Sequence, residues 1–301
     1  MSILSIRNVV KAYSNHIAVN NVSLEIPKGK IFGMLGPNGA GKTSLIRMIT
    51  SITRADKGEI ILDGEKLNAS HPMVIGYLPE ERGLYKKMKV GEQLLYLARL
   101  KGLSPQESKR KLNSWLEKFN ITDWWDKKVG ELSKGMQQKV QFIATVVHDP
   151  KLIILDEPFS GLDPINTNLI KDEIHEMNKN GTSVIFSTHR MEQVEQICEV
   201  IALINQGKII LEGDVAEIKK ENKENKYEIE FDGTFPPDML ADSFEIVADT
   251  DTSLIIQAKE GHDSNELLRG LLDRNISIQS YREVLPSLNE IFIKKVGESN
   301  E

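Results

Sequence analysis

Cysteine and long apolar runs are both scarce in this 301-residue chain. The one cysteine, Cys198, rules out an internal disulfide and fits a reducing cytosol. Its surroundings, "QVEQICEVIALI", favour a small buried thiol over a reactive one. No apolar run approaches the roughly 20 residues of a membrane span, and no signal-peptide pattern opens the chain. We therefore expect a cytosolic protein that reaches a membrane only through a partner chain.

Excess positive charge and internal repeats are missing as well. The formal net charge of −6 argues against broad nucleic-acid binding. Hydrophobic residues make up 40% of the chain and charged residues 27%, which is ordinary for a soluble globular protein. The length suffices for one large domain and a small one.

Strand and helix patterns alternate through the first 218 residues, which indicates an α/β fold with a mostly parallel sheet. A helical region is predicted from about residue 86 to 148. In it, Ser104, Pro105 and Glu107 form a capping box with proline at the first helical position. The predicted strands are "LSIRNVVKAY", "VNNVSLEIP", "GKIFGML", "KLIILD", "TSVIFS", "EVIALI" and "KIILEG".

The composition changes at residues 219–226, "KKENKENK", a charged run without an apolar anchor. Such a run is typical of a linker or a fraying helix end. Beyond it, residues 227–301 contain short strand patterns and two helix patterns. We expect a small α+β domain there.

The motif "GPNGAGKTS" at residues 36–44 matches G-x-x-x-x-G-K-[ST] and lies between a buried strand and a helix, the context that a phosphate-binding loop requires. Its glycines let backbone N–H groups face phosphate oxygens, and the helix N-terminus adds positive potential. Lys42 can reach the β- and γ-phosphates, and the Thr43 hydroxyl can bind Mg²⁺. We expect the nucleotide to contact the whole loop: Gly36, Pro37, Asn38, Gly39, Ala40, Gly41, Lys42, Thr43 and Ser44.

Two carboxylates end the apolar strand "KLIILDEP". Asp156, at the strand end, suits the Mg²⁺ shell, directly or through water. Glu157 follows it, where a general base could hold the attacking water. Beside the phosphate loop, this pair predicts a nucleotide-hydrolysing enzyme.

The segment "ELSKGMQQKVQF" combines a capping residue, Ser133, with Gly135, which permits close approach of a ligand to the backbone. A second phosphate-facing helix and an ordinary capped core helix would look alike in isolation.

With these motifs in order, the chain resembles the nucleotide-binding subunits of ATP-binding-cassette (ABC) transporters. The resemblance covers residues 1 to about 218 and rests on "GPNGAGKTS", "LSKGMQQ", "IILDEP", "SGLD" and "STH". It implies a P-loop NTPase core of ABC type, with an antiparallel β subdomain, a helical subdomain and Mg²⁺-ATP as ligand. It also implies a head-to-tail dimer with two ATP molecules between the phosphate loop of one chain and the signature segment of the other.

By the same resemblance, Ser133 and Gly135 would hold the γ-phosphate of the partner's ATP, and Asp163 would lie in the loop at the dimer interface. Tyr13 would stack on adenine, although an exposed tyrosine at a strand end is the alternative reading. His189, after the strand "TSVIF", would contact the γ-phosphate. The other histidines show no metal-ligand spacing, and the tryptophans are interpreted as packing or partner contacts.

The sequence departs from the family pattern at two places. Lys134 and Met136 stand where the signature has glycine and glutamine. Glu80, in "LPEERGLY", stands where the family has a glutamine that reaches Mg²⁺ and the attacking water. The local charge run Glu80-Glu81-Arg82 suggests a solvated loop. The resemblance instead makes Glu80 a site residue that binds Mg²⁺.

The segment "LPEERGLY" and the ending "PSLNEIFIKKV" resemble a bacterial subgroup that includes sodium-extrusion ATPases and drug or peptide-antibiotic exporters. We therefore expect the ATPase subunit of an exporter, attached to the inner face of the membrane through separate permease chains. Its dimer partner would be a second copy or a related ATPase subunit, and no nucleic acid would be bound.

The alternative is a soluble ABC ATPase, but a translation-associated one would carry two cassettes. A chromosome-maintenance ATPase would need a long coiled coil between the phosphate loop and the signature.

Overall fold

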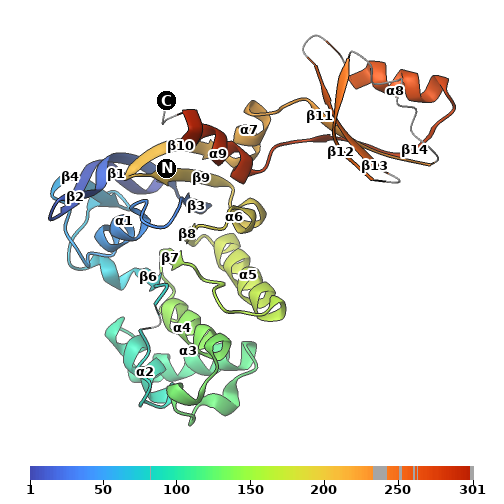
Figure 1. Ribbon diagram of the computed structural model, residues 1–301. Helices are drawn as coiled ribbons and strands as arrows, with labels where there is room; N and C mark the ends of the chain where they lie inside the picture. The colour runs from blue at the N-terminus through green and yellow to red at the C-terminus, as the bar shows by residue number, and fades with distance from the viewer. Residues whose placement is uncertain (82, 233–242, 251–252, 260–261, 263, 299–301) are drawn as a thin grey trace. The chain divides into compact units, whose positions relative to one another are not determined.

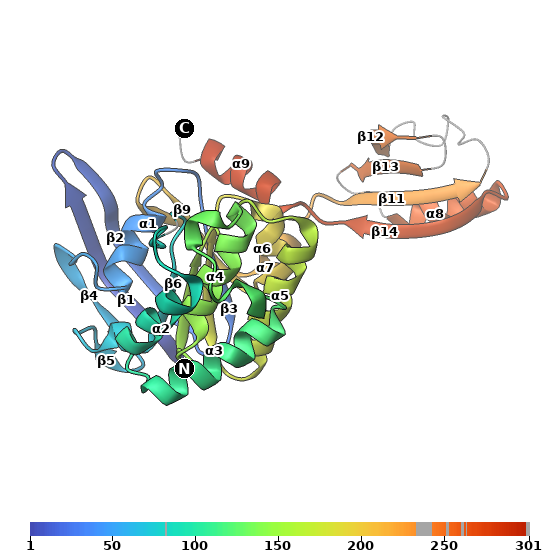
Figure 2. The same cartoon turned by 90° about the horizontal axis from the view of Figure 1, so that it is seen from below.

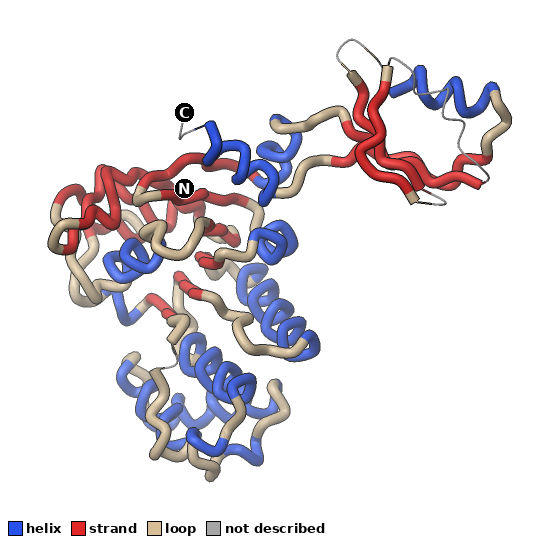
Figure 3. The backbone as a smooth tube through the Cα atoms, in the orientation of Figure 1, coloured by secondary structure: helices blue, strands red, loops and turns tan. Residues whose placement is uncertain are grey.

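The computed structural model describes residues 1–301 except 82, 233–242, 251–252, 260–261, 263 and 299–301. The chain divides into two compact units, Met1–Val215 and Ala216–Glu301. The first unit contains two sheets and most of the helices, and the second contains a third sheet (Figure 3). The predicted α/β class is therefore confirmed. Arg82, from the charge run at Glu80, lies outside the described residues.

An antiparallel sheet with the strand order β2-β1-β4-β5 opens the first unit. β1 (Ser2–Tyr13) and β2 (His16–Pro27) confirm the first two predicted strands. The sequence did not predict β4 (Lys57–Leu62) and β5 (Glu65–Lys66). These two strands form a short hairpin, and β4 also pairs with β1. Asp63-Gly64 between them is a strong hairpin signal in the sequence.

A six-stranded sheet with the order β10-β9-β3-β8-β7-β6 forms the centre of the unit. Its parallel strands are β3 (Ile31–Leu35), β6 (Ile75–Leu78), β7 (Leu152–Asp156), β8 (Ser183–Thr188) and β9 (Val200–Asn205). β10 (Lys208–Asp214) adds an antiparallel edge. Every residue of β3, β7 and β8 is buried, as expected for parallel strands covered on both faces.

Helices cover both faces of this sheet (Figures 1 and 2). α1 (Lys42–Ile49) lies between the two sheets, and its apolar side chains share one buried core with both. α5 (Pro164–Lys179) and α6 (Met191–Ile197) lie on the opposite face from α1. Cys198 follows α6 and is buried as predicted, and burial raises the pKa of its thiol.

The helical region contains α2 (Val90–Leu100), α3 (Pro105–Lys118) and α4 (Lys134–Val146). The predicted capping box is confirmed, because the Ser104 hydroxyl accepts a hydrogen bond from the Glu107 N–H at 3.2 Å. Trp115 packs with Phe119 and Phe142 at ring-centroid distances of 5.7 and 6.2 Å, as the packing interpretation expected.

The second unit begins inside α7 (Val215–Glu221), so the boundary predicted at residue 218 falls within a helix. Ile218, in this helix just before the charged run, is buried. β11 starts at Lys226, so residues 222–225 connect α7 to β11 within the charged run.

A four-stranded sheet and two helices follow α7. The sheet contains β11 (Lys226–Asp232), β12 (Phe244–Asp249), β13 (Ser253–Ala258) and β14 (Ser277–Val284). Side chains of α8 (Ser264–Asp273) join its buried core, and α9 (Leu288–Glu298) closes the described chain. This is the small α+β domain that the sequence predicted.

Candidate nucleotide-binding and catalytic site

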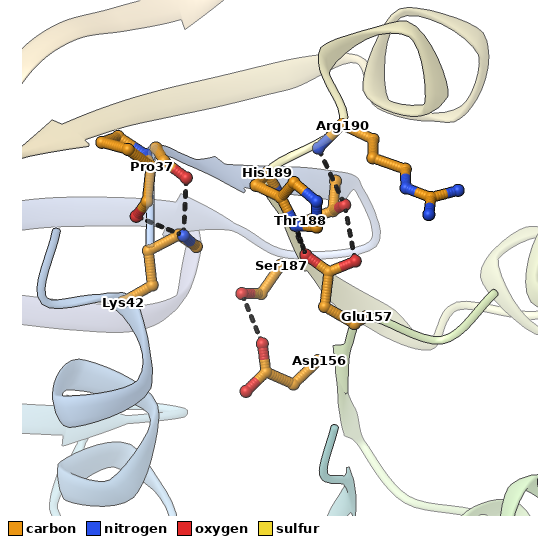
Figure 4. Close-up of polar contacts among 9 residues, drawn as sticks. Pro37, Lys42, Asp156, Glu157, Ser187, Thr188, His189 and Arg190 are labelled. Carbon is orange, nitrogen blue, oxygen red and sulfur yellow. Dashed lines mark hydrogen bonds and ion pairs between the residues drawn. The ribbon is translucent and has the colours of Figure 1, made fainter. Parts of the chain in front are cut away.

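The phosphate loop, residues 36–44, connects the carboxyl end of β3 to the N-terminus of α1. Gly41 has φ +109°, and a Cβ there would lie 2.2 Å from the carbonyl oxygen of Ala18, so only glycine fits. The Lys42 ammonium donates to the carbonyl oxygens of Gly36 and Pro37 at 2.6 and 3.0 Å (Figure 4). Burial lowers the pKa of Lys42, although three nearby carboxylates oppose this shift. The loop thus holds a buried lysine through its own carbonyl oxygens.

A pocket opens over this loop, and most of the predicted residues line it. Tyr13, Asn38 to Ser44, Glu80, Asp156 and Glu157 all contribute to its wall. Glu80 therefore lies beside the two strand-end carboxylates, which its local sequence did not suggest. Gly36 and Pro37 are not in the wall but hold Lys42 through their carbonyls. His16 and Ala18, which the sequence analysis did not identify, complete the wall from β2.

Asp156 is 3% exposed and accepts a hydrogen bond from the Ser187 hydroxyl at 2.8 Å. Burial raises the pKa of the Asp156 carboxyl, and the carboxylates of Glu80 and Glu157 act in the same direction. The Ser187 hydroxyl and Lys42 oppose this shift only in part. Without a bound cation, the folded protein therefore disfavours the ionised form of this carboxyl.

This burial predicts that Asp156→Asn stabilises the nucleotide-free protein. The amide keeps the acceptor for Ser187 and removes a buried charge, so we expect the melting temperature to rise by about 2–4 °C, the effect of about 1 kcal/mol in a domain of this size. If the pocket binds Mg²⁺-ATP as predicted, this ligand should raise the melting temperature of the wild type more than that of the variant. Scanning calorimetry with and without Mg²⁺-ATP measures both effects. Asp172→Asn, on the exposed face of α5, is the control and should change neither; a lower apo melting temperature for Asp156→Asn would contradict the prediction.

Glu157 has a strained backbone, and two hydrogen-bond donors and an imidazole nitrogen surround its side chain. Its φ is +50°, which is unusual for a residue with a Cβ and typical of functional sites. One carboxylate oxygen accepts from the backbone N–H of His189 at 2.8 Å, and the other accepts from the Thr188 hydroxyl at 3.0 Å. His189 Nδ1 lies 2.6 Å from the first oxygen (Figure 4). The end of β8 therefore fixes the orientation of this carboxylate.

A second pocket contains three further predicted residues, whereas His189 lines neither this pocket nor the first one. Ser133, Gly135 and Asp163 line it together, with Lys134 and Trp124. Ser133 caps α4 by accepting from the Met136 N–H at 3.2 Å, and Asp163 caps α5 by accepting from the Asn166 N–H at 2.9 Å. We call the pocket over the phosphate loop the Lys42 pocket and this one the Ser133 pocket. Among the described residues, none lines both of them. One chain thus carries two separate sets of predicted nucleotide contacts.

α4 connects the two sets. The Gln141 side-chain amide donates to the Pro79 carbonyl at 3.2 Å, next to Glu80. The Gln138 amide donates to the Pro158 carbonyl at 2.8 Å, next to Glu157. The helix that starts at Ser133 therefore contacts the neighbours of both carboxylates.

Comparisons with known proteins match both units. The family model "ABC transporter" matches residues 19–160, and "ATP-binding protein DrrA1-3-like, C-terminal domain" matches residues 213–296. The chain is 43% identical over 294 residues to the uncharacterized ABC transporter ATP-binding protein YhaQ of Bacillus subtilis, covering 98% of each chain.

Other relatives match about three quarters of this chain. The lipopolysaccharide export system ATP-binding protein LptB of Haemophilus influenzae is 35% identical over 74% of this chain and 95% of its own. The linearmycin resistance ATP-binding protein LnrL of Bacillus subtilis is 36% identical over 70% and 68%. A solved ATP-binding subunit of an ABC transporter aligns with a TM-score of 0.69 at 27% identity, covering 73% of this chain and 93% of that one.

Proposed function

Because this chain belongs to the ABC transporter ATP-binding proteins and is therefore an ATPase, we propose that it drives a bacterial exporter as a head-to-tail dimer. The observation that carries the dimer is the division of the nucleotide contacts between two pockets of one chain. In a two-fold dimer, the Lys42 pocket of one chain would face the Ser133 pocket of the other, and each ATP would be enclosed by both.

On the phosphate side, Tyr13 stacks on adenine and the loop N–H groups bind the phosphates. Lys42 exchanges the carbonyl oxygens of Gly36 and Pro37 for β- and γ-phosphate oxygens, which needs only rotation of a flexible side chain. Ser133 and Gly135 of the second chain enclose the γ-phosphate, with Asp163 at the same interface.

Mg²⁺ fits this pocket because Glu80, Asp156 and Glu157 outnumber the single lysine in its wall. A triphosphate would be repelled there without a cation. Among the described residues, no group of three His, Cys, Asp or Glu side chains could hold a metal ion. We infer that phosphate oxygens supply further ligands to the ion. Thr43, Asp156 and Glu80 would hold it, directly or through water. When bound, Mg²⁺ neutralises the charge that develops on the phosphates.

Glu157 acts as the general base. Its carboxylate accepts a proton from the attacking water, and Thr188 and His189 hold it in one orientation while it does so. The His189 side chain is 45% exposed, so the imidazole can also contact the γ-phosphate.

Glu80 makes the enzyme depend more strongly on Mg²⁺ than a glutamine would. The carboxylate attracts the hard cation but repels the triphosphate when the cation is absent. We expect Glu80→Gln to retain hydrolysis and to need about tenfold more Mg²⁺ for half-maximal rate, the effect of about 1.4 kcal/mol, whereas Glu80→Lys should be nearly inactive. ATPase rates across a Mg²⁺ titration at fixed ATP measure this. Glu81→Gln, next to it but outside the pocket wall, is the control; identical curves for all variants would place Glu80 in a solvated loop.

Export and membrane attachment complete the proposal. LptB and LnrL are named for export and for resistance, which supports outward transport. A sodium ion, a drug or a peptide antibiotic is the substrate that the resemblance to the exporter subgroup implies. No helix among the described residues has the length and apolarity to cross a bilayer. We therefore infer that separate permease chains hold the protein at the cytoplasmic face of the membrane.

The test is purification of the tagged full-length chain from native membranes in mild detergent. We expect a multi-span chain to copurify in fixed stoichiometry and to raise the ATPase rate. Recovery from the cytosol without any membrane chain, at full ATPase activity, would instead favour a soluble ABC ATPase.

A further inference from the structure

We propose that Gly207, in the tight turn between β9 and β10, is a positioning residue. It would hold the β1–β2 hairpin, which would bind adenine, at a fixed distance from the phosphate loop. Gly207 does not line the Lys42 pocket, so it acts only through its neighbours. The inference rests on the proposed assignment of that pocket to ATP and extends it to a residue outside the pocket wall.

The turn has a defined geometry. Asn205 and Lys208 pair across the hairpin, which leaves Gln206 and Gly207 as a two-residue loop. Both have positive φ, +48° and +74°, as a type I′ turn requires. The position of Gly207 is therefore fixed by the paired strands.

Gly207 joins two parts of the site through its own backbone. Its N–H donates to the carbonyl of Ala40 in the phosphate loop at 2.8 Å. Its carbonyl accepts from the N–H of Asn20 in β2, also at 2.8 Å. β2 and β10 also contact each other. The backbone of Gly207 thus connects the phosphate loop to β2 of the antiparallel sheet.

The carbonyl of Ala18 packs against two glycines at this point. A Cβ on Gly41 would lie 2.2 Å from the Ala18 oxygen, and a Cβ on Gly207 would lie 2.9 Å from it. Ala18 also lines the nucleotide pocket. We call these five residues the Gly207 junction: Ala18, Asn20, Ala40, Gly41 and Gly207.

The junction matters because adenine and the phosphates would contact different sheets. Tyr13 and His16 belong to the β1–β2 hairpin of the antiparallel sheet, whereas the phosphate loop follows β3 of the six-stranded sheet. A single ATP molecule makes both sets of contacts only if their spacing matches its length. A shift of β2 against the loop therefore weakens adenine binding while the phosphate contacts persist.

Gly207→Asn tests this proposal against a matched control. Asparagine enters the left-handed region more readily than other residues with a Cβ, so the turn is retained while the new Cβ presses on Ala18. Gly64→Asn is the control, because Asp63 and Gly64 form the same kind of turn, with φ +50° and +87°. No atom of the described residues lies within 4 Å of a Cβ on Gly64. Circular dichroism and melting curves recorded without nucleotide show that both variants are folded before their affinities are compared.

Calorimetric titrations with Mg²⁺-ATP and with Mg²⁺ and inorganic tripolyphosphate give the readout. We expect Gly207→Asn to weaken ATP binding about tenfold, a loss within the range of base–aromatic stacking, and to leave tripolyphosphate binding unchanged. Gly64→Asn should change neither. The proposal is overturned if ATP affinity matches the control, or if both probes lose equally. Equal wild-type affinity for the two probes would instead remove the adenine role of Tyr13.

Discussion

Glu157→Gln is expected to lower the steady-state ATPase rate at least about 100-fold, the scale of a lost general base, while ATP binding persists. The amide keeps the size of the side chain and its hydrogen bond from Thr188, but it cannot take a proton from water. Because bound ATP is no longer cleaved, we expect an ATP-bound dimer to accumulate. Size-exclusion chromatography with Mg²⁺-ATP, beside an ATPase assay, measures both effects.

The matched control for this variant is Glu173→Gln, a carboxylate on α5 that is also buried but lies outside both pockets. Its ion-pair partner is Lys118, which lines neither pocket. The variant should therefore retain turnover even if it loses stability. Normal turnover in Glu157→Gln would remove this residue from the catalytic role.

Ser133→Arg has the second large expected effect. The arginine would fill the pocket that receives the partner's ATP, so hydrolysis should fall to background while the monomer still binds nucleotide in its own Lys42 pocket. The lost helix cap costs only about 1 kcal/mol, which leaves the protein folded. Nucleotide titration, chromatography and an ATPase assay on the same sample separate these outcomes.

Ser104→Arg is a close control for the cap itself. Ser104 and Ser133 each accept a hydrogen bond from the third backbone N–H of their helices at 3.2 Å. Ser104 lines neither nucleotide pocket, so its variant should lose similar stability and keep hydrolysis. Equal ATPase activity in the two arginine variants would mean that Ser133 faces no nucleotide.

The sequence predicted those parts of the site that depend on local backbone. The phosphate loop is one motif between a strand and a helix, so its glycines, Lys42 and the helix N-terminus lie together whatever the rest of the chain does. The capped start of α4 at Ser133 was local for the same reason.

Long-range contacts could not be predicted in this way. The strained φ of Glu157 is stabilised by its N–H bond to the Ser187 carbonyl and by the end of β8, about 30 positions away in the chain. Ala18 and His16 enter the pocket only because β2 packs beside the phosphate loop. Glu80 shows the same limit, since its neighbours in sequence are loop charges and its neighbours in space are Asp156 and Glu157.

The central claim is that each catalytic site needs two chains, and mixing two inactive variants tests it most directly. Lys42→Ala removes the phosphate side of a site and keeps its own Ser133 pocket, whereas Ser133→Arg does the reverse. In a mixed head-to-tail dimer, one site combines both defects and the other is intact. We expect equimolar mixing to restore about a quarter of the wild-type ATPase rate, because about half of the dimers are mixed and each has one intact site. A mixture no more active than the sum of its two components, at every ratio, would contradict the account.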